Sequence, residues 1–378
     1  MKRHVLFLIE SLAGGGAEKV LTTLVQHIDK TKFEVTVCTI SGGGKFECFV
    51  RECVKYHAIL NEPIGNNVIK KLFYNIKHHL VYKWLPLSWV YRLFVPQHHD
   101  VEIAYVEGFT TKLLSHSTNT KARRYAWLHI DLFQNHWTQS IYGSLANETE
   151  AYNCFNGIYG VSQTVQKAFL KEFPDVHTVV GKMYNPIDSL EIKNKALEME
   201  EIKHKKPLLV TVGRLEHQKG YDRLVEISHR LVGDGFKFEL WILGVGSQEE
   251  QLNDYIKKHH LDDMVKLLGF QSNPYKYMAR ADLFVCSSRS EGYSTAVTEA
   301  LILGLPVITT ECSGMVELLK NGECGLITEN DDEAFYEGLK SLLNDAAMLA
   351  HYREKAVERG KDFTIESLME PIEKLLME

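Results

Sequence analysis

A polar, glycine-containing turn between an apolar strand and an apolar helix is the feature that most constrains the fold of this sequence. The strand covers 283–286, the turn 290–294 and the helix about 295–303, and a Gly-Leu-Pro corner then leads into a buried strand at 305–309. Such a strand–turn–helix–strand unit is typical of α/β proteins with parallel sheets. The helix therefore begins at the carboxyl edge of a sheet, where such folds bind ligands.

The turn combines an anion site with two carboxylates. The N–H groups of Ser294, Thr295 and Ala296 and the helix dipole favour a phosphate. Glu291 lies in the turn and Glu299 lies about one turn into the helix. A carboxylate that pointed at the phosphate would repel it, so we expect the two acids to accept hydrogen bonds from neutral hydroxyls, as in a sugar or ribose. The alternative is a dipole-complementing acid and a solvated glutamate.

A second loop supplies positive charge. A strand at 207–212 is followed by GRLEHQKG at 213–220. Arg214 and Lys219 therefore lie at the carboxyl edge of a sheet, where a planar guanidinium and an ammonium together suit a diphosphate. Either residue alone would be an ordinary surface cation.

These loops resemble those of a known enzyme family. The Glu-x7-Glu spacing of Glu291 and Glu299, the Gly-Leu-Pro-Val corner and the turn at 311–316 are similar to the signature of family 4 glycosyltransferases, and VGRLEHQKG resembles that family's phosphate-binding loop. The resemblance extends over most of the chain. It implies a retaining, nucleotide-sugar-dependent enzyme of the GT-B architecture: α/β, two Rossmann-like domains facing a cleft, and a C-terminal helix that crosses back to the N-terminal domain.

Length and composition agree with two domains, because 378 residues are many for one core. We expect an N-terminal acceptor-side domain at 1–184, a charged linker at 185–206, a nucleotide-sugar-binding domain at 207–360 and a crossover helix at 361–378. Apolar and β-branched runs predict N-terminal strands at 5–9, 33–40, 56–60, 101–106, 124–128 and 158–161.

The resemblance assigns roles to individual residues. Arg214 and Lys219 are expected to neutralise the leaving diphosphate, Glu291 to hold the donor sugar, and His129 to contact that sugar from the end of its strand; Asp131 is a further candidate. The expected donor-binding residues, among which Glu299 would hold the ribose, are Gly15, Gly16, Gly213, Gly244, Phe270, Tyr293, Ser294, Thr295 and Glu299.

Several other chemistries are not expected. The GGGAEK stretch at 14–19 lacks the P-loop spacing, and GVG at 244–246 lacks the third glycine of a dinucleotide fingerprint. No Asp-x-Asp pair is present, so we expect neither a metal nor another cofactor, with the two cations acting in place of a metal. A net charge of −6 argues against nucleic-acid binding.

Cysteine usage and hydropathy indicate where the chain acts. The seven cysteines are scattered without a C-x-x-C pair, which indicates reduced thiols in the cytoplasm. The apolar run at 5–9 is too short for a signal peptide, and no uncharged apolar run is long enough to span a bilayer.

The segment 63–99 has a different character. It lacks acidic residues and interleaves Lys70, Lys71, Lys77, Lys83 and Arg92 with Phe73, Tyr74, Tyr82, Trp84, Trp89, Tyr91 and Phe94. Basic helices with aromatic side chains suit an anionic membrane surface, so we expect peripheral contact with the inner face of the cell membrane. The alternative is a pair of surface helices whose aromatic residues belong to the core.

The sequence therefore predicts a bacterial hexosyltransferase of surface polysaccharide synthesis. Its donor would be a UDP-sugar, with GDP as the second carrier, and its acceptor a hydroxyl of a lipid-linked glycan. Two alternatives are a nucleotide-sugar epimerase or phosphorylase, which needs no alcohol acceptor, and an inactive nucleotide-sugar-binding scaffold. The presence of Arg214, Lys219, Glu291 and Glu299 together argues against the scaffold.

Overall fold

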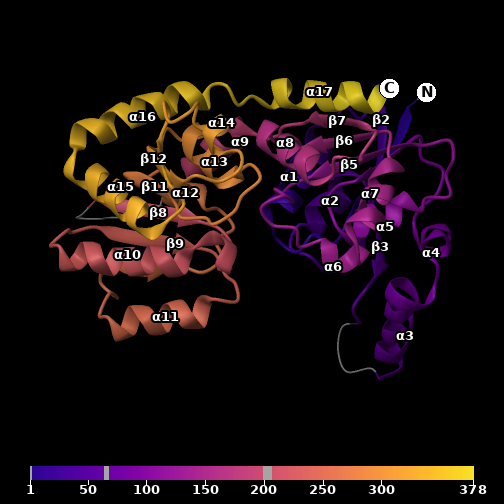
Figure 1. The fold of residues 1–378 in the computed structure, drawn as a ribbon, viewed down its shortest axis with the longest axis horizontal. Coiled ribbons are helices and arrows are strands. Elements are labelled where there is room, and N and C mark those ends of the chain that lie inside the picture. Colours follow the sequence, from indigo (N-terminus) through magenta and orange to yellow (C-terminus); the bar gives the residue numbers. More distant parts are fainter. Residues whose placement is uncertain (1, 64–67, 199–206) are drawn as a thin grey trace. The chain divides into compact units, whose positions relative to one another are not determined.

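Two parallel β-sheets organise the chain, one in each of two units (Figure 1). The computed structural model describes residues 2–63, 68–198 and 207–378. The first unit comprises Met1–Ile187 together with Ile365–Glu378, and the second comprises Asp188–Thr364. The predicted α/β class with two parallel sheets is confirmed.

The sheet of the first unit has seven strands in the order β3-β2-β1-β4-β5-β6-β7, all parallel. Its central strand β1 is a continuous apolar run because helices cover both faces of such a sheet, and Val5 to Leu8 are fully buried. The strands are β1 (Arg3–Ile9), β2 (Phe33–Ser41), β3 (Lys55–Leu60), β4 (Val101–Ala104), β5 (Arg123–Leu128), β6 (Gly157–Gly160) and β7 (Val179–Lys182).

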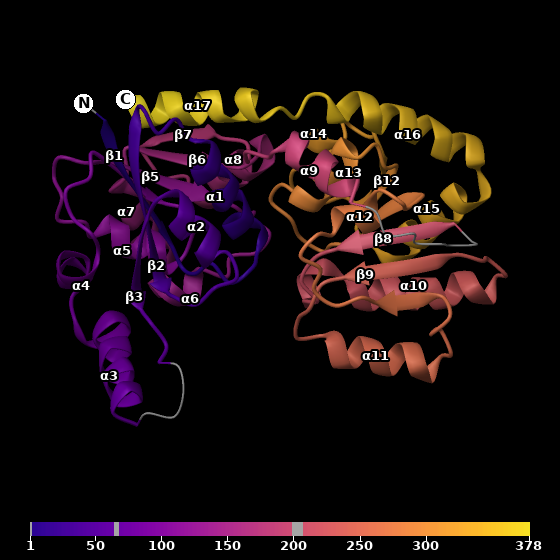
Figure 2. The same cartoon turned by 180° about the vertical axis from the view of Figure 1, so that it is seen from behind.

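The helices of the first unit, apart from the last one, connect these strands in chain order. They are α1 (Gly16–His27), α2 (Glu47–Cys53), α3 (Val68–His79), the π-helical turn η1 (Leu80–Trp84), α4 (Leu87–Phe94), α5 (Phe109–Ser115), α6 (Gln139–Tyr142), α7 (Leu145–Asn153), α8 (Gln163–Glu172) and α17 (Ile365–Met377). Helix α3 projects from the body of this unit (Figures 1 and 2). None of its residues is buried.

The last helix, α17, belongs to the first unit and packs against α1 and β1. Ile372 and Leu376 are fully buried there. The carboxylate of Glu373 accepts a hydrogen bond from the Asp29 N–H at 2.9 Å and pairs with the Lys32 ammonium at 3.3 Å. The chain therefore returns from the second unit to complete the first, as the GT-B resemblance implies.

The second unit repeats the same topology with six parallel strands in the order β10-β9-β8-β11-β12-β13. Its strands are β8 (Leu208–Val212), β9 (Glu239–Leu243), β10 (Val265–Leu267), β11 (Leu283–Cys286), β12 (Val307–Thr310) and β13 (Leu326–Thr328). Its helices are α9 (Ser189–Ala196), η2 (His217–Lys219), α10 (Tyr221–Gly233), α11 (Glu249–Lys258), α12 (Tyr275–Met278), α13 (Thr295–Ile302), α14 (Met315–Leu318), α15 (Asp332–Asn344) and α16 (Ala346–Gly360).

The boundaries of the units differ from the predicted ones in two places. Part of the expected linker at 185–206 forms α9, which packs against α12 and α13 of the second unit. The remainder of that linker, 199–206, lies outside the described residues. Residues 361–364, expected in the crossover helix, belong to the second unit.

No helix in the part of the chain that the structure describes is both long enough and apolar enough to cross a membrane.

Removing the buried side chain of Ile372 should weaken the docking of α17. Ile372→Ala leaves a cavity against the first unit, and such substitutions cost about 2–5 kcal/mol. We expect a lower urea midpoint with an unchanged slope for this variant. Glu370→Ala changes an exposed residue of the same helix and serves as the control. Equal midpoints for the two variants would show that α17 does not stabilise the unit.

Candidate functional site

Two loops meet at the carboxyl edge of the second sheet. One loop follows β8 and the other follows β11, and these strands are parallel neighbours where the strand order reverses. In open α/β sheets this reversal point is where ligands bind. It brings together the two sequence motifs, which are far apart along the chain.

A buried ion pair joins the two loops. The Lys219 ammonium lies 2.6 Å from Oε1 of Glu291, and the Ser288 hydroxyl donates to the same oxygen at 2.6 Å. Glu291 is 7% exposed. Burial alone would lower the pKa of Lys219, but the Glu291 carboxylate outweighs this effect and raises it. Lys219 is therefore an ammonium at neutral pH, with N–H donors beyond the one it gives to Glu291.

Arg223 holds the loop after β11 in place through hydrogen bonds to its backbone. This residue is 4% exposed on α10, and its guanidinium donates to the carbonyl oxygens of Ser287 and Ser288, each at 2.7 Å. Arg289 reaches back to Asp222 through two hydrogen bonds of 2.7 and 2.9 Å. The sequence argument did not identify Arg223, because an arginine inside a helix ordinarily lies on the surface.

Glycine is required at one position in the loop after β8 and at one position in the loop after β9. A Cβ on Gly220, whose φ is +65°, would lie 2.1 Å from the Ser287 carbonyl oxygen. A Cβ on Gly244, whose φ is +149°, would lie 1.8 Å from the carbonyl oxygen of Gly213. The expected donor-binding residues Gly213 and Gly244 thus lie backbone to backbone, and Gly244 lets the β8 and β9 loops approach each other.

The start of α13 forms the third side of the site. Ser294 caps the helix by accepting a hydrogen bond from the Val297 N–H at 3.4 Å. Ser294 and Tyr293 are buried, whereas Thr295 is partly exposed. Glu299 is 3% exposed, and its Oε1 accepts a long hydrogen bond of 3.5 Å from the Tyr275 hydroxyl of α12.

Arg214 and Phe270 are exposed at the same carboxyl edge. Arg214 follows β8 directly, and Phe270, which follows β10, is 50% exposed. The structure therefore gathers all the predicted residues of the second unit along one edge of one sheet.

The predicted residues of the first unit occupy the corresponding edge of its own sheet. Gly15 is the N-cap of α1 and Gly16 begins that helix, in the loop after β1. His129 follows β5, and its N–H donates to Oε2 of Glu107 at 3.0 Å. Burial lowers the pKa of His129 to about 4, so the imidazole is neutral at pH 7. Its Nε2 is buried, with no hydrogen-bond partner among the described residues.

The neighbouring carboxylates have different roles. Asp131 is 3% exposed and accepts a hydrogen bond from the Gln134 N–H at 2.9 Å, so its carboxylate caps a turn. Glu107, at 7% exposed, orients the backbone of His129 from the loop after β4. Burial raises the pKa of Glu107. It follows the strand predicted at 101–106, and that position was the available signal for it.

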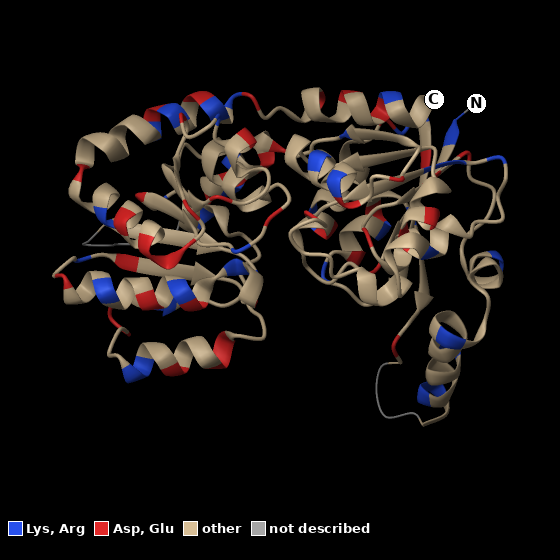
Figure 3. Ribbon diagram, in the orientation of Figure 1, with Lys and Arg blue, Asp and Glu red and all other residues tan. Residues whose placement is uncertain are grey.

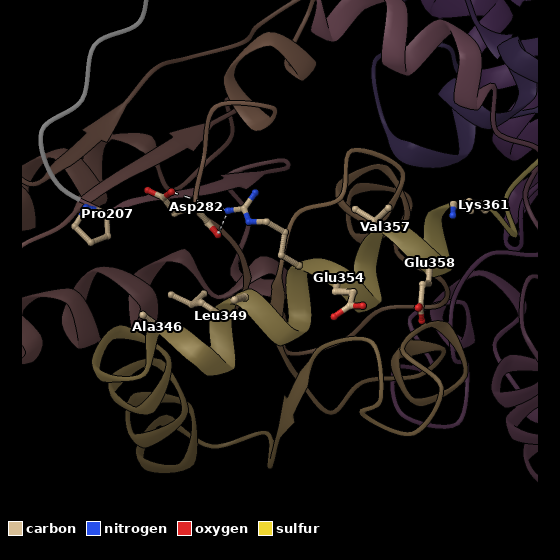
Figure 4. A pocket seen from close by; sticks show the side chains of 10 residues that line it. Pro207, Asp282, Ala346, Leu349, Glu354, Val357, Glu358 and Lys361 are labelled. Atoms are coloured by element: carbon tan, nitrogen blue, oxygen red, sulfur yellow. Dashed lines mark hydrogen bonds and ion pairs between the residues drawn. The ribbon is translucent and has the colours of Figure 1, made fainter.

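A groove on α16 is lined by Pro207, Asp282 and residues of that helix (Figure 4). Arg353 also lines this groove and donates to the Asp282 carbonyl oxygen at 3.2 Å, and the Asp282 side chain accepts from the Leu208 N–H at 2.8 Å. These contacts fasten α16 to the amino ends of β8 and β11. The groove therefore lies at the sheet edge opposite to the two loops, which is not where such folds bind ligands.

No group of three or more His, Cys, Asp or Glu residues within the described ranges is arranged to hold a metal ion. Metal-free catalysis remains a prediction.

Two Rossmann-like units, each with a parallel sheet, place the chain in the GT-B class of fold. Solved structures share this fold: Anabaena HepE with UDP and glucose has a TM-score of 0.76, 19% identity and 99% coverage of both chains. Sucrose-phosphate synthase from Thermosynechococcus elongatus gives a TM-score of 0.76 at 14% identity, covering 99% of this chain and 98% of that one.

Sequence comparison then identifies the family. Residues 193–362 match the model of the glycosyl transferases group 1. The N-acetylgalactosamine-N,N'-diacetylbacillosaminyl-diphospho-undecaprenol 4-alpha-N-acetylgalactosaminyltransferase of Campylobacter jejuni is 30% identical over 360 residues, or 94% of each chain. The amylovoran biosynthesis glycosyltransferase AmsK of Erwinia amylovora is 32% identical over 47% of each chain. The chain belongs to the glycosyl transferases group 1 family.

Acid should destabilise the protein in part through His129. The pKa of its imidazole is about 4 in the folded state, below the ordinary value of 6.5. Between these values the unfolded chain binds a proton that the folded chain does not, so stability falls as the pH decreases from about 6.5 to about 4. We expect His129→Gln to lose less stability than the wild type between about pH 7.5 and about pH 5, measured by urea unfolding.

The matched control is His27→Gln, which changes an exposed histidine of the same unit. If His129→Gln and this control lose the same stability on acidification, His129 is not the group that titrates.

Proposed function

We propose that the protein is a retaining, metal-independent glycosyltransferase that moves a hexose-type sugar from a UDP-sugar to a hydroxyl of a lipid-linked glycan. The observation that carries this proposal is the contact between Lys219 and Glu291 at the carboxyl edge of the second sheet. Two comparisons support the substrates: the Anabaena structures contain UDP with glucose, and the Campylobacter relative is named for a diphospho-undecaprenol substrate.

The diphosphate of the donor fits the cations of the β8 loop. Lys219 keeps N–H donors beyond its bond to Glu291, and the exposed Arg214 adds a guanidinium. The backbone N–H groups at the start of α13 add the positive end of a helix dipole. As the bond from sugar C1 to the phosphate oxygen breaks, these groups stabilise the negative charge on UDP, each contributing about 3 kcal/mol.

The sugar and ribose hydroxyls fit the carboxylates. Lys219 and Ser288 both bond to Oε1 of Glu291, so Oε2 can accept from a sugar hydroxyl. Glu299 is the proposed partner of the ribose. His129 is proposed to contact the donor sugar, and its neutral imidazole would add no charge there.

The acceptor is proposed to attack on the same face that UDP leaves. A bond forms between its oxygen and C1, the bond from C1 to phosphate breaks, and the acceptor proton passes to a phosphate oxygen. No metal is needed in this scheme, because Arg214 and Lys219 neutralise the diphosphate.

Arg214→Ala should lower kcat while leaving the fold intact. Losing one donor to the leaving group costs about 2.7–4 kcal/mol, a fall of about 10²–10³-fold in kcat. UDP release from UDP-glucose, UDP-galactose and their N-acetylamino forms would be measured in EDTA with a panel of alcohol acceptors. Lys258→Ala, an exposed cation of the same unit, is the control.

Four outcomes test the proposal and its alternatives. Turnover that EDTA abolishes would refute metal independence, and wild-type kcat in Arg214→Ala would refute the role of that residue. Donor conversion that alcohol acceptors do not accelerate would favour an epimerase or a phosphorylase. If neither UDP nor GDP raises the melting temperature at saturating concentration, the proposed donor site is wrong; about 2.7 kcal/mol of stabilisation is expected at 100 Kd.

The membrane side of this proposal rests on the face of α3 and the residues after it. Figure 3 shows basic residues and no acidic residue along α3. Large apolar side chains in this segment are exposed by 40–78%: Val68, Ile69, Leu72, Phe73, Ile76, Trp84, Trp89 and Leu93. Exposed apolar and basic side chains on one segment match a bilayer that contains anionic lipids, and we place this surface on the inner face of the cell membrane.

The aromatic residues of the segment fall into two groups. Tyr91 is fully buried and its hydroxyl donates to Glu102 at 2.5 Å, so it belongs to the core. Phe73, Trp84 and Trp89 are 57–68% exposed and are the residues available to a bilayer.

Charging the α3 face should release the protein from vesicles. The Leu72→Glu/Phe73→Glu variant loses two large apolar side chains. Full burial of each such side chain contributes about 1.5–3 kcal/mol of favourable free energy. We expect at least about tenfold weaker sedimentation with vesicles of phosphatidylcholine and phosphatidylglycerol. Phe49→Glu/Leu170→Glu alters exposed apolar residues elsewhere in the same unit and is the control. Equal binding by both variants would remove this surface from the proposal.

A further inference from the structure

Glu10 directly follows the central strand β1 of the first sheet, and none of the roles proposed above includes it. The order of strands reverses between β1 and β4, so the end of β1 is at the point where this sheet would bind a ligand. Glu10 is partly exposed there.

Tyr82 of η1 is placed over this point. Its hydroxyl donates to Oε1 of Glu10 at 2.7 Å. Its ring lies 4.6 Å, between centroids, from the ring of Phe109, which begins α5 in the connection after β4. Tyr82 therefore contacts the connections that follow both strands of the reversal point.

The local geometry of the segment produces this contact. Helix α3 runs directly into η1, a π-helical turn, and such turns are rare in proteins and frequent at functional sites. In this turn Tyr82 is directed to Glu10, whereas Trp84, two residues later, is 62% exposed. One helical segment thus carries both the apolar face proposed to meet the bilayer and a side chain at the ligand edge of β1.

The carboxylate of Glu10 has capacity for a ligand. Within the described part of the chain, its one side-chain hydrogen bond is the one from Tyr82 to Oε1, so Oε2 can accept from a hydroxyl. Tyr82 fixes the direction in which Oε2 points. A site built to accept from a hydroxyl strongly rejects a ligand that lacks it, because the carboxylate would then be left unpaired.

We infer that Glu10 accepts a hydrogen bond from a sugar hydroxyl of the acceptor glycan, and that Tyr82 positions Glu10 for this contact. The inference rests on the proposed glycosyl transfer to a lipid-linked acceptor. It adds a specificity-determining residue on the acceptor side, held in place by the segment that meets the membrane. The class of ligand is a neutral, hydroxylated sugar that is joined through its anomeric carbon to a lipid diphosphate.

The test compares the acceptor KM with donor hydrolysis. The probes are farnesyl-diphosphate-linked N-acetylglucosamine and N-acetylgalactosamine as acceptors, with the UDP-sugar that the wild type uses. Slow release of UDP without acceptor reports the donor half of the reaction. The variants are Glu10→Gln, Tyr82→Phe and the double variant.

A lost hydrogen bond to a charged group costs about 1.5–3 kcal/mol, so Glu10→Gln should raise the acceptor KM about 10–150-fold. Tyr82→Phe, which keeps the aromatic ring in contact with Phe109, should raise the acceptor KM less than Glu10→Gln does. The double variant should match Glu10→Gln, because Tyr82 acts only through Glu10. Donor hydrolysis should stay at the wild-type rate in all three.

A matched pair on the same unit supplies the control. Tyr56 of β3 donates its hydroxyl to Oε2 of Glu47 of α2 at 2.9 Å, so this pair joins β3 to α2 and leaves Glu10 bonded to Tyr82. Glu47→Gln and Tyr56→Phe should leave the acceptor KM unchanged.

Two results would overturn the inference. One is an acceptor KM within about twofold of wild type in Glu10→Gln and Tyr82→Phe, and the other is an equal fall in donor hydrolysis and transfer, which indicates a purely structural contact. Failure of the proposed function would look different, because the wild type itself would then release no UDP from any UDP-sugar, with or without acceptor.

Discussion

The buried contact between Lys219 and Glu291 is the interaction on which the second unit's site depends. It ties the loop after β8 to the loop after β11, and Arg223 holds the second loop in place through the carbonyl oxygens of Ser287 and Ser288. A buried ion pair contributes little net stability unless further hydrogen bonds satisfy it. Here the Ser288 hydroxyl supplies one of them. We interpret the pair as a device that fixes the position of the ammonium before a diphosphate arrives.

The two units use one topology for different chemistry. In the second unit the reversal point carries a lysine, an arginine and the start of a helix, which suit anions. At the equivalent edge, the first unit presents glycines, a neutral histidine and buried carboxyls, which suit hydroxyls. The fold provides the location in both cases, and the loop residues decide what can bind there.

Most of the fold and part of the site could be predicted from the sequence. Continuous apolar runs such as Val5 to Ile9 predict buried parallel strands, and the structure has β1 there. The edge strand β7 was missed because its residues are half-exposed and include Gly181, so no apolar pattern marks it. Lys219 and Glu291 could be placed together because both follow strands. Arg223 and the Glu10–Tyr82 contact could not, because tertiary packing brings their partners together across long stretches of sequence.

Helix α17 makes the first unit the last to be completed. The chain leaves the ribosome from the N-terminus, and the strands of the first sheet emerge long before Ile365–Glu378. Until then, only water or a chaperone can cover the faces of α1 and β1 that α17 later covers. The same holds for the Asp29 N–H, which later donates to Glu373. The second unit, continuous from Asp188 to Thr364, can close first. Synthesis therefore runs from the first unit to the second, whereas folding finishes in the reverse order, and a chain that ends a few residues early has a second unit that is whole and a first unit that is open.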